Sequence, residues 1–178
     1  MENYPKPVTK ENLEIILDYL NNSIYKIKGN EDKYGIGVFC SLKCHDKKIF
    51  VLITNYYIVD ENYLKNYDYI DVLINQKFIR IEFNYIYYLE KQLDLSVIEI
   101  KKNEKIKILD LDDDIYKKES EMYLNKESIY IINNNSVSYS IINNITKSEF
   151  IFNCNLSDNT CCYPIFNLKT NKLIGISQ

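Results

Sequence analysis

The chain has little of several residue types that mark particular classes of protein. Its 178 residues include no Trp and no Ala, one Arg, one His, four Gly and three Pro. A single Arg and a net charge of −3 argue against the basic surface that a nucleic-acid-binding protein presents to phosphate. No apolar run approaches the roughly 18 residues of a membrane span. The first fifteen residues also lack the apolar core of a signal peptide. We therefore expect a cytoplasmic protein without nucleic-acid or membrane partners.

The cysteines point to neither a disulfide framework nor a cofactor. Five Cys is an odd number and follows no regular spacing, so we expect reduced thiols. Cys40 and Cys44 share strand parity but His45 does not, and no second ligand pair has zinc spacing. Residues 110–114 are acidic but lack the Gly and distal Glu of a calcium loop. No phosphate-binding or dinucleotide-binding glycine motif is present. The sequence predicts no metal and no cofactor.

The abundant residues carry less information than the rare ones. Ile, Asn, Lys and Tyr supply about half of the chain, and all four have AT-rich codons. We interpret the 17 Tyr as a result of genome base composition rather than as a tyrosine-rich binding surface. With 46% hydrophobic and 26% charged residues, the chain has the composition of a globular protein. Its length fits one domain or two small lobes.

Residues 9–21 have the pattern of a short amphipathic helix. Thr9 is a suitable N-cap, and Glu11 lies in the first turn. Apolar residues then recur at helical spacing, at Leu13, Ile16, Leu17 and Leu20. We expect this helix to pack against its own domain.

Most of the remaining chain predicts short β-strands in two groups. The acidic segment 101–118 has no clear period and separates the groups as a linker. The fold class is therefore all-β, with a helical segment at 1–22, a first β-unit at 23–105 and a linker with a second β-unit at 106–178. The predicted strands span residues 23–28, 35–42, 48–54, 69–74, 78–88, 95–100, 128–133, 137–142, 150–155, 163–168 and 173–177.

Three segments together resemble the trypsin-like serine protease family. The strand at 51–54 ends in Thr-Asn, an Asp precedes the apolar strand at 95–100, and the stretch 159–164 reads Asn-Thr-Cys-Cys-Tyr-Pro. A Leu-Ile-Gly-Ile strand then follows at 173–176, and a Gly-Ile-Gly-Val-Phe lead-in stands at 35–39. The family has the same order of strand contexts. The resemblance covers residues 23 to 178 and implies two small antiparallel β-barrels with a cleft between them.

The resemblance assigns family roles to five positions. Asp94 falls on the triad aspartate and Tyr57 on the triad histidine. Cys161 falls on the nucleophilic serine and Cys162 on the glycine after it. Asn159 falls on the oxyanion-hole glycine, so that Asn159 and Cys161 would supply the oxyanion position. For Asp94, an alternative is a structural turn in which the carboxylate accepts backbone hydrogen bonds.

The departures from the family pattern predict a loss of catalysis. The ordinary pKa of a tyrosine is about 10, so Tyr57 would be a poor base at neutral pH. Loss of the histidine alone lowers kcat by a factor on the order of 10⁶. An unperturbed Cys161 thiol would be only a few per cent ionised. The only histidine, His45, precedes the strand at 48–54 and would lie more than about 20 Å from Tyr57.

Three functional hypotheses follow. The first is an inactive trypsin-like protease homologue, a pseudoprotease, that binds a peptide or protein in its cleft. The second is an active endopeptidase with Cys161 as nucleophile, and the third is an unrelated all-β interaction module. Family members usually continue beyond the strand at 173–176. We therefore expect a second barrel that is truncated at its C-terminus, with an open edge that favours self-association.

Overall fold

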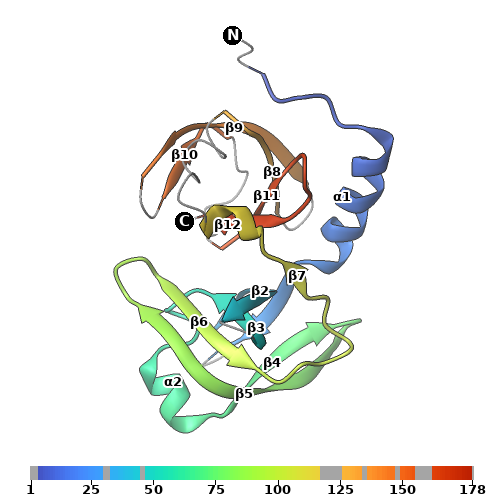
Figure 1. Ribbon diagram of the computed structural model, residues 1–178. Helices are drawn as coiled ribbons and strands as arrows, with labels where there is room; N and C mark the ends of the chain where they lie inside the picture. Colours follow the sequence, from blue (N-terminus) through green and yellow to red (C-terminus); the bar gives the residue numbers. More distant parts are fainter. Residues whose placement is uncertain are drawn as a thin grey trace.

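The computed structural model describes residues 4–29, 33–44, 47–116, 126–133, 136–146, 149–154 and 162–177. Within these ranges, the side chains of Cys44, Ile86, Tyr87 and Asp113 are not described. The chain forms two β-sheets, one after the other, with one longer helix alongside them (Figure 1). The prediction of an all-β fold with an N-terminal helix is confirmed at this level.

The first sheet closes into a ring. Its order is β1-β4-β5-β6-β3-β2, and β2 also pairs with β1. Each pairing within the ring is antiparallel, and β7 adds to β2 in parallel outside it. Each strand of the ring therefore has a neighbouring strand on both sides over at least part of its length. The strands are β1 (Tyr25–Lys28), β2 (Tyr34–Cys44), β3 (Lys47–Thr54), β4 (Tyr69–Ile74), β5 (Lys77–Glu90), β6 (Leu95–Ile100) and β7 (Leu109–Asp110).

The second sheet curves into a half-barrel. Its order is β10-β9-β8-β11-β12, with every pairing antiparallel. A Cβ on Gly175 would lie 2.8 Å from the Phe150 ring, so the curvature brings the two edges of the sheet together and needs a glycine at this contact. No β10–β12 pairing occurs among the described residues. The strands are β8 (Ser128–Ile132), β9 (Val137–Ile145), β10 (Phe150–Phe152), β11 (Pro164–Asn167) and β12 (Leu173–Ile176).

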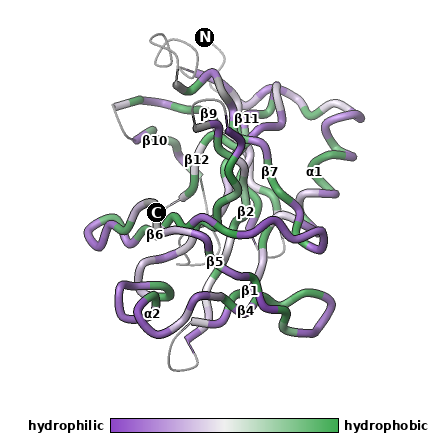
Figure 2. The backbone as a smooth tube through the Cα atoms, turned by 60° about the horizontal axis from the view of Figure 1, so that its bottom comes forward, coloured by the Kyte–Doolittle hydropathy of each residue, from purple (hydrophilic) through white to green (hydrophobic). Residues whose placement is uncertain are grey.

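Two hydrophobic cores stabilise this arrangement. One fills the ring and includes Ile27, Leu52 and Ile98. The other joins both sheets, because Val38 of β2 and Phe166 of β11 belong to the same buried cluster. Figure 2 shows hydrophobic stretches along β2, β11 and β12, where the sheets meet. The shared core fixes the second sheet against the first.

Helix α1 (Lys10–Asn22) packs along this shared core. The Thr9 side chain accepts a hydrogen bond from the Asn12 N–H at 3.2 Å, which confirms the predicted N-cap. Ile16 is fully buried, whereas Leu13 and Leu17 of the predicted apolar stripe are exposed. The docking face is therefore centred on Ile16, and Asn12 extends it by donating to the Leu168 carbonyl at 2.8 Å.

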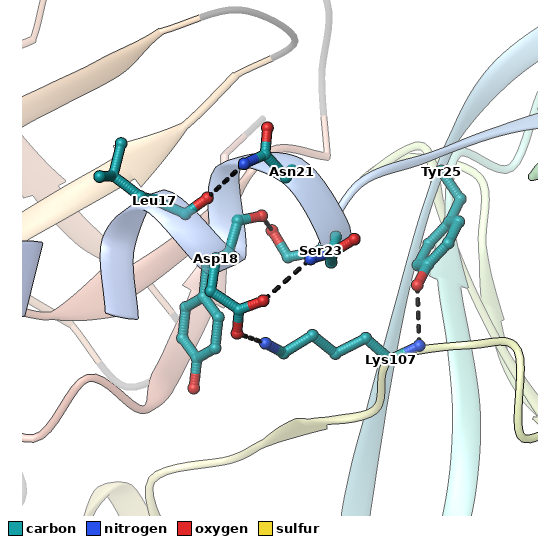
Figure 3. A network of polar contacts seen from close by, with 8 residues as sticks. Leu17, Asp18, Asn21, Ser23, Tyr25 and Lys107 are labelled. Atoms are coloured by element: carbon teal, nitrogen blue, oxygen red, sulfur yellow. Dashed lines mark hydrogen bonds and ion pairs between the residues drawn. The ribbon is translucent and has the colours of Figure 1, made fainter. Parts of the chain in front are cut away.

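Lys107 ties the connecting segment to both α1 and the first sheet (Figure 3). Its ammonium group pairs with Asp18 and lies 4.6 Å from the centroid of the Tyr19 ring. Its backbone N–H donates to the Tyr25 hydroxyl at 2.7 Å. Burial lowers the pKa of Lys107. The side chain of Lys107 is thus held by the helix and its backbone by the first sheet.

Two elements depart from the sequence-based expectation. Helix α2 (Glu61–Asn66) was not predicted; its N-cap is Asp60, which accepts from the Tyr63 N–H at 2.8 Å. The segment expected to be a plain linker contains β7 and a 3₁₀ helix at Asp113–Tyr116. Asp110 of that segment contacts the Ser41 hydroxyl and the Lys48 ammonium, each at 3.2 Å. These contacts attach the acidic segment to the first sheet.

The buried tyrosines predict a loss of stability in alkali. Burial raises the pKa of Tyr130 and of Tyr63 above the ordinary value of 10.0. Both phenols stay protonated in the folded chain but ionise near pH 10 once the chain unfolds. The unfolded state then binds fewer protons, so the free energy of unfolding should fall as pH rises above 10. Urea unfolding across this pH range measures the fall, and Tyr130→Phe should make it shallower. A stability that stays level would contradict the prediction.

Candidate functional site

The loop after β3 is held by buried polar residues. The Thr54 hydroxyl donates to the Ile36 carbonyl at 2.7 Å, and both Thr54 and Asn55 are buried. The Asn55 carbonyl accepts hydrogen bonds from Ile58 and Val59 at 3.1 and 3.2 Å. These bonds fold the chain back on itself immediately after the strand. As a result, residues 55–57 are held at the end of β3 beside the β5–β6 turn.

Asp94 joins this loop to the β5–β6 turn. One carboxylate oxygen accepts from the Tyr57 backbone N–H at 2.9 Å, and the other accepts from the Asn55 side-chain amide at 2.9 Å. The Asp94 carbonyl also accepts from the Tyr56 N–H at 3.1 Å. The residue has a φ of 44°, a conformation that Asp tolerates better than most residues do. The structure thus brings Asp94 into direct contact with Tyr57.

The side chains around Asp94 are poorly suited to general base catalysis at neutral pH. The Tyr57 side chain is 47% exposed, and the hydrogen bond to Asp94 uses its backbone N–H. The neighbouring Tyr56 phenol donates to Glu61, and this hydrogen bond raises the pKa of Tyr56 to about 12. The same bond lowers the pKa of Glu61. A general base works best with a pKa near the operating pH, which neither an ordinary tyrosine nor Tyr56 provides.

The other half of the predicted site is only partly described. Asn159 and Cys161 lie outside the described residues. The structure resumes at Cys162, which is buried and has a φ of 72°. Its N–H donates to the Ser177 carbonyl at 2.7 Å, and the Tyr163 N–H donates to the Ser177 hydroxyl at 3.1 Å. Tyr163 is fully buried in the core shared by the sheets, so its side chain packs into the core and is not an exposed lining group.

The open end of the β11–β12 hairpin, opposite its turn at residues 168–172, lies on the same side of the molecule as the β5–β6 turn. The β5–β6 turn and the C-terminal end of the chain, just after β12, lie on one side in both Figure 1 and Figure 2. Asp94 belongs to that turn, and Ser177 follows β12 directly. The two sheets therefore present these two segments on a common side.

The only histidine, His45, lies outside the described residues. Strand β3 begins two residues after it, at Lys47, and ends at Thr54. The full length of this strand therefore stands in the chain between His45 and Tyr57.

The described residues do not form a cluster of potential metal ligands. In the part of the chain that the structure describes, no group of three or more His, Cys, Asp or Glu could hold a metal ion. Cys40 is fully buried, and burial raises the pKa of its thiol to about 12. Such a thiol is a poor ligand because a metal binds the thiolate form.

Two features of the structure were not predicted from the sequence. Asn55 was noted only as part of the Thr-Asn strand end, yet its buried amide holds Asp94. A groove of about 600 Å³ also lies between the end of α2 and β5. The sequence carries no signal for it, because apolar and polar residues alternate without interruption through Phe83-Asn84-Tyr85. The groove is lined by Leu64, Lys65, Asn66, Tyr67, Asp68, Phe83, Asn84 and Tyr85.

Comparison with known proteins does not assign the chain to a family. No protein-family model matches the sequence, and the search of curated proteins found no match either. Among the described residues, neither α1 nor α2 nor any other helix has the length and apolar character needed to cross a membrane.

Proposed function

We propose that the protein is a catalytically inactive homologue of the trypsin-like serine proteases that binds an extended peptide between its two sheets. The observation that carries this proposal is the pair of hydrogen bonds that the Asp94 carboxylate accepts from the loop of Tyr57. In the trypsin-like family that the chain resembles, the carboxylate at this position lies beside the catalytic base. Here the residue beside it is a tyrosine, and both carboxylate oxygens hold the loop in place.

The order of elements supports the resemblance. A closed ring of six strands comes first and a curved sheet of five strands follows. Tyr57 comes three residues after β3, Asp94 directly precedes β6, and Cys161 precedes β11. The family motifs have these same strand contexts. Two β-units with the corresponding positions at their strand ends are what the resemblance requires.

The chemistry supports the loss of activity. The family mechanism needs a group that takes the proton of the nucleophile and returns it to the leaving amine. A tyrosine at position 57 would have to be a phenolate to act in this way, and a phenol with a pKa of about 10 is protonated at pH 7. Cys161 is a stronger nucleophile than Ser, but without a base it is mostly a thiol.

Peptide binding does not require the missing base. Strands β10 and β12 are the two ends of the second sheet, and a strand at the end of a sheet can pair with an added strand. The core shared by the sheets places β12 near the first sheet, and because Leu173 already forms a bridge with Leu111, an added strand would pair with the rest of β12. An extended peptide bound there would be held by main-chain hydrogen bonds and needs no catalytic triad.

The experiment that tests this proposal measures turnover and thiol reactivity in the same proteins. A diverse pool of fluorogenic peptides is incubated with the parent protein and with Cys161→Ala. We expect both to release no more fluorophore than the buffer does. Cleavage by the parent that is lost in Cys161→Ala would contradict inactivity and would favour the cysteine endopeptidase.

The second arm tests the layout of the site. In Tyr57→His, an imidazole next to Cys161 should stabilise the thiolate and increase the rate of Cys161 alkylation at pH 7 about tenfold. Tyr139→His is the matched control, because Tyr139 is a similarly exposed tyrosine on β9 of the second sheet. Mass spectrometry assigns the alkylated cysteine. Equal rates in the two variants would contradict a trypsin-like arrangement of positions 57 and 161.

A further inference from the structure

The groove between α2 and β5 has the composition of a ligand site. Its two half-buried residues are apolar, Leu64 and Phe83, and two exposed tyrosines, Tyr67 and Tyr85, stand beside them. Tyr85 is 72% exposed. Tyr67 is held in place by its contacts with the Tyr63 and Tyr69 rings, at centroid distances of 4.8 and 5.7 Å. The groove therefore offers a partly fixed aromatic surface to solvent.

Strand β5 changes partners at this groove. It pairs with β4 from Lys77 to Glu82 and with β6 from Phe83 to Glu90. On the side away from β6, the Phe83 N–H still donates to the Asp68 carbonyl at 2.8 Å. Beyond that bond, no strand pairs with this side of β5 in the described part of the chain. A free strand edge thus runs out of the groove from residue 84 to residue 90.

A β-bulge sets the direction of this edge. The pairing of β5 with β6 shifts register twice, between Phe83 and Tyr85 and again between Ile86 and Tyr88. The first shift leaves Asn84 without a partner residue on β6. A bulge bends its strand and redirects nearby side chains. Here Asn84 and Tyr85 are exposed on the wall of the groove. The polar backbone edge and the aromatic side chains therefore lie next to each other, so one ligand could contact both.

We propose that this groove and the free edge of β5 bind an extended, uncharged peptide segment by β-strand addition. The backbone of the peptide would pair with residues 84–90, and one of its apolar side chains would lie between Tyr67 and Tyr85. The charged groups that line the groove are Lys65 and Asp68, and their charges cancel. A peptide without net charge therefore matches the groove. The site uses neither Asp94 nor Cys161, so it does not depend on the function proposed above.

The test uses an end-capped, fluorescent peptide of alternating Leu and Thr as the probe, with the full chain. We expect saturable binding by fluorescence anisotropy and slower hydrogen exchange at the amides of residues 84–90. Methylation of alternate amide nitrogens in the peptide should weaken binding at least tenfold, because it removes the donors that strand addition needs. Tyr85→Ala should also weaken it about tenfold, as expected for an aromatic contact in a binding site. Because the Tyr85 side chain is exposed, we expect the Tyr85→Ala variant to fold as the parent protein does.

The matched control is Tyr139→Ala, an exposed tyrosine on the other sheet, which should bind the probe as the parent does. Equal binding of the methylated and unmethylated peptides would overturn the proposal, and so would equal binding by Tyr85→Ala and the parent. Two further results would assign the groove to another occupant. A dimer of the free protein that Tyr85→Ala abolishes would indicate a second copy of the chain. Protection of residues 84–90 by an oligosaccharide and not by the peptide would indicate a carbohydrate.

Discussion

Replacement of Asp94 with Ala should lower the free energy of unfolding by about 3 kcal/mol. The change removes the acceptor for the Tyr57 N–H and for the buried Asn55 amide. Hydrogen bonds to a charged group contribute about 1.5–3 kcal/mol each, and an orphaned buried donor adds a desolvation cost. The φ of 44° adds about 1 kcal/mol or more, because Ala avoids the left-handed region. The expected total is smaller than the sum of these contributions, because the loop can relax and expose its unpaired polar groups to water.

Two further variants separate these contributions. Asp94→Gly removes the carboxylate but tolerates a positive φ, so it should cost less than Asp94→Ala. Asp94→Asn keeps one acceptor oxygen and should cost about 1 kcal/mol. Urea denaturation measures all three, and Glu104→Ala, an exposed carboxylate on the connecting segment, is the control. If Asp94→Ala were as stable as Glu104→Ala, the structural role of the Asp94 carboxylate would be refuted.

Replacement of Phe166 with Ala should have the largest effect on stability in the core, about 3–5 kcal/mol. The Phe166 side chain is fully buried where the two sheets meet. Its ring stacks on Tyr130 at 4.9 Å and contacts Tyr19 of α1 at 5.0 Å. The cavity left by Ala would remove contacts of the second sheet and of the helix at once. The free energy of unfolding of a small protein is about 5–15 kcal/mol in total. A loss of this size would therefore leave the folded chain only marginally stable.

Thermal and urea unfolding of Phe166→Ala test this prediction against Phe78→Ala. Phe78 lies on β5 and is 45% exposed, so its truncation should change stability by less than about 1 kcal/mol. If Phe166→Ala is too unstable to purify, Phe166→Leu gives a smaller loss of the same sign. A loss below about 1 kcal/mol for Phe166→Ala would show that the core shared by the sheets contributes little.

Two strands could be predicted from the sequence with both ends correct. The bounds 69–74 and 95–100 match β4 and β6. Between β4 and β5, Asn75 and Gln76 adopt positive φ values of 49° and 65°, as the tight turns of β-hairpins require. In these segments the strand-forming residues and the turn residues follow one another directly, so both indicate the same strand ends.

Elements that depend on distant partners could not be predicted in this way. Strand β7 has two residues and exists because it pairs with β2. Helix α2 has six residues, too few for a hydrophobic period to be recognised and too few to be stable alone. Tertiary contacts stabilise both elements, and a short local pattern does not encode such contacts.

The candidate site shows the same division. The sequence singled out Asp94 and Tyr57 by their places at strand ends, and the structure joins them by a hydrogen bond. That bond uses a backbone N–H, so the identity of residue 57 does not determine it. The contribution of Asn55 depends on a loop that folds back after β3, and a linear pattern of side chains carries no signal for such a fold. Asn159 and Cys161 remain predictions from the sequence.

The sequence by itself determined the all-β class, the capped helix at Thr9 and most strands, because side-chain periodicity and turn residues act within a few positions. The tertiary structure decided which strands pair, how the first sheet closes through β1 and β2, and which face of α1 is buried. Leu13 and Leu17 fit the helical stripe as well as Ile16 does, yet only Ile16 is buried. Burial depends on which surface faces the helix, and that surface is formed by residues more than a hundred positions away, such as Phe166 and Leu168.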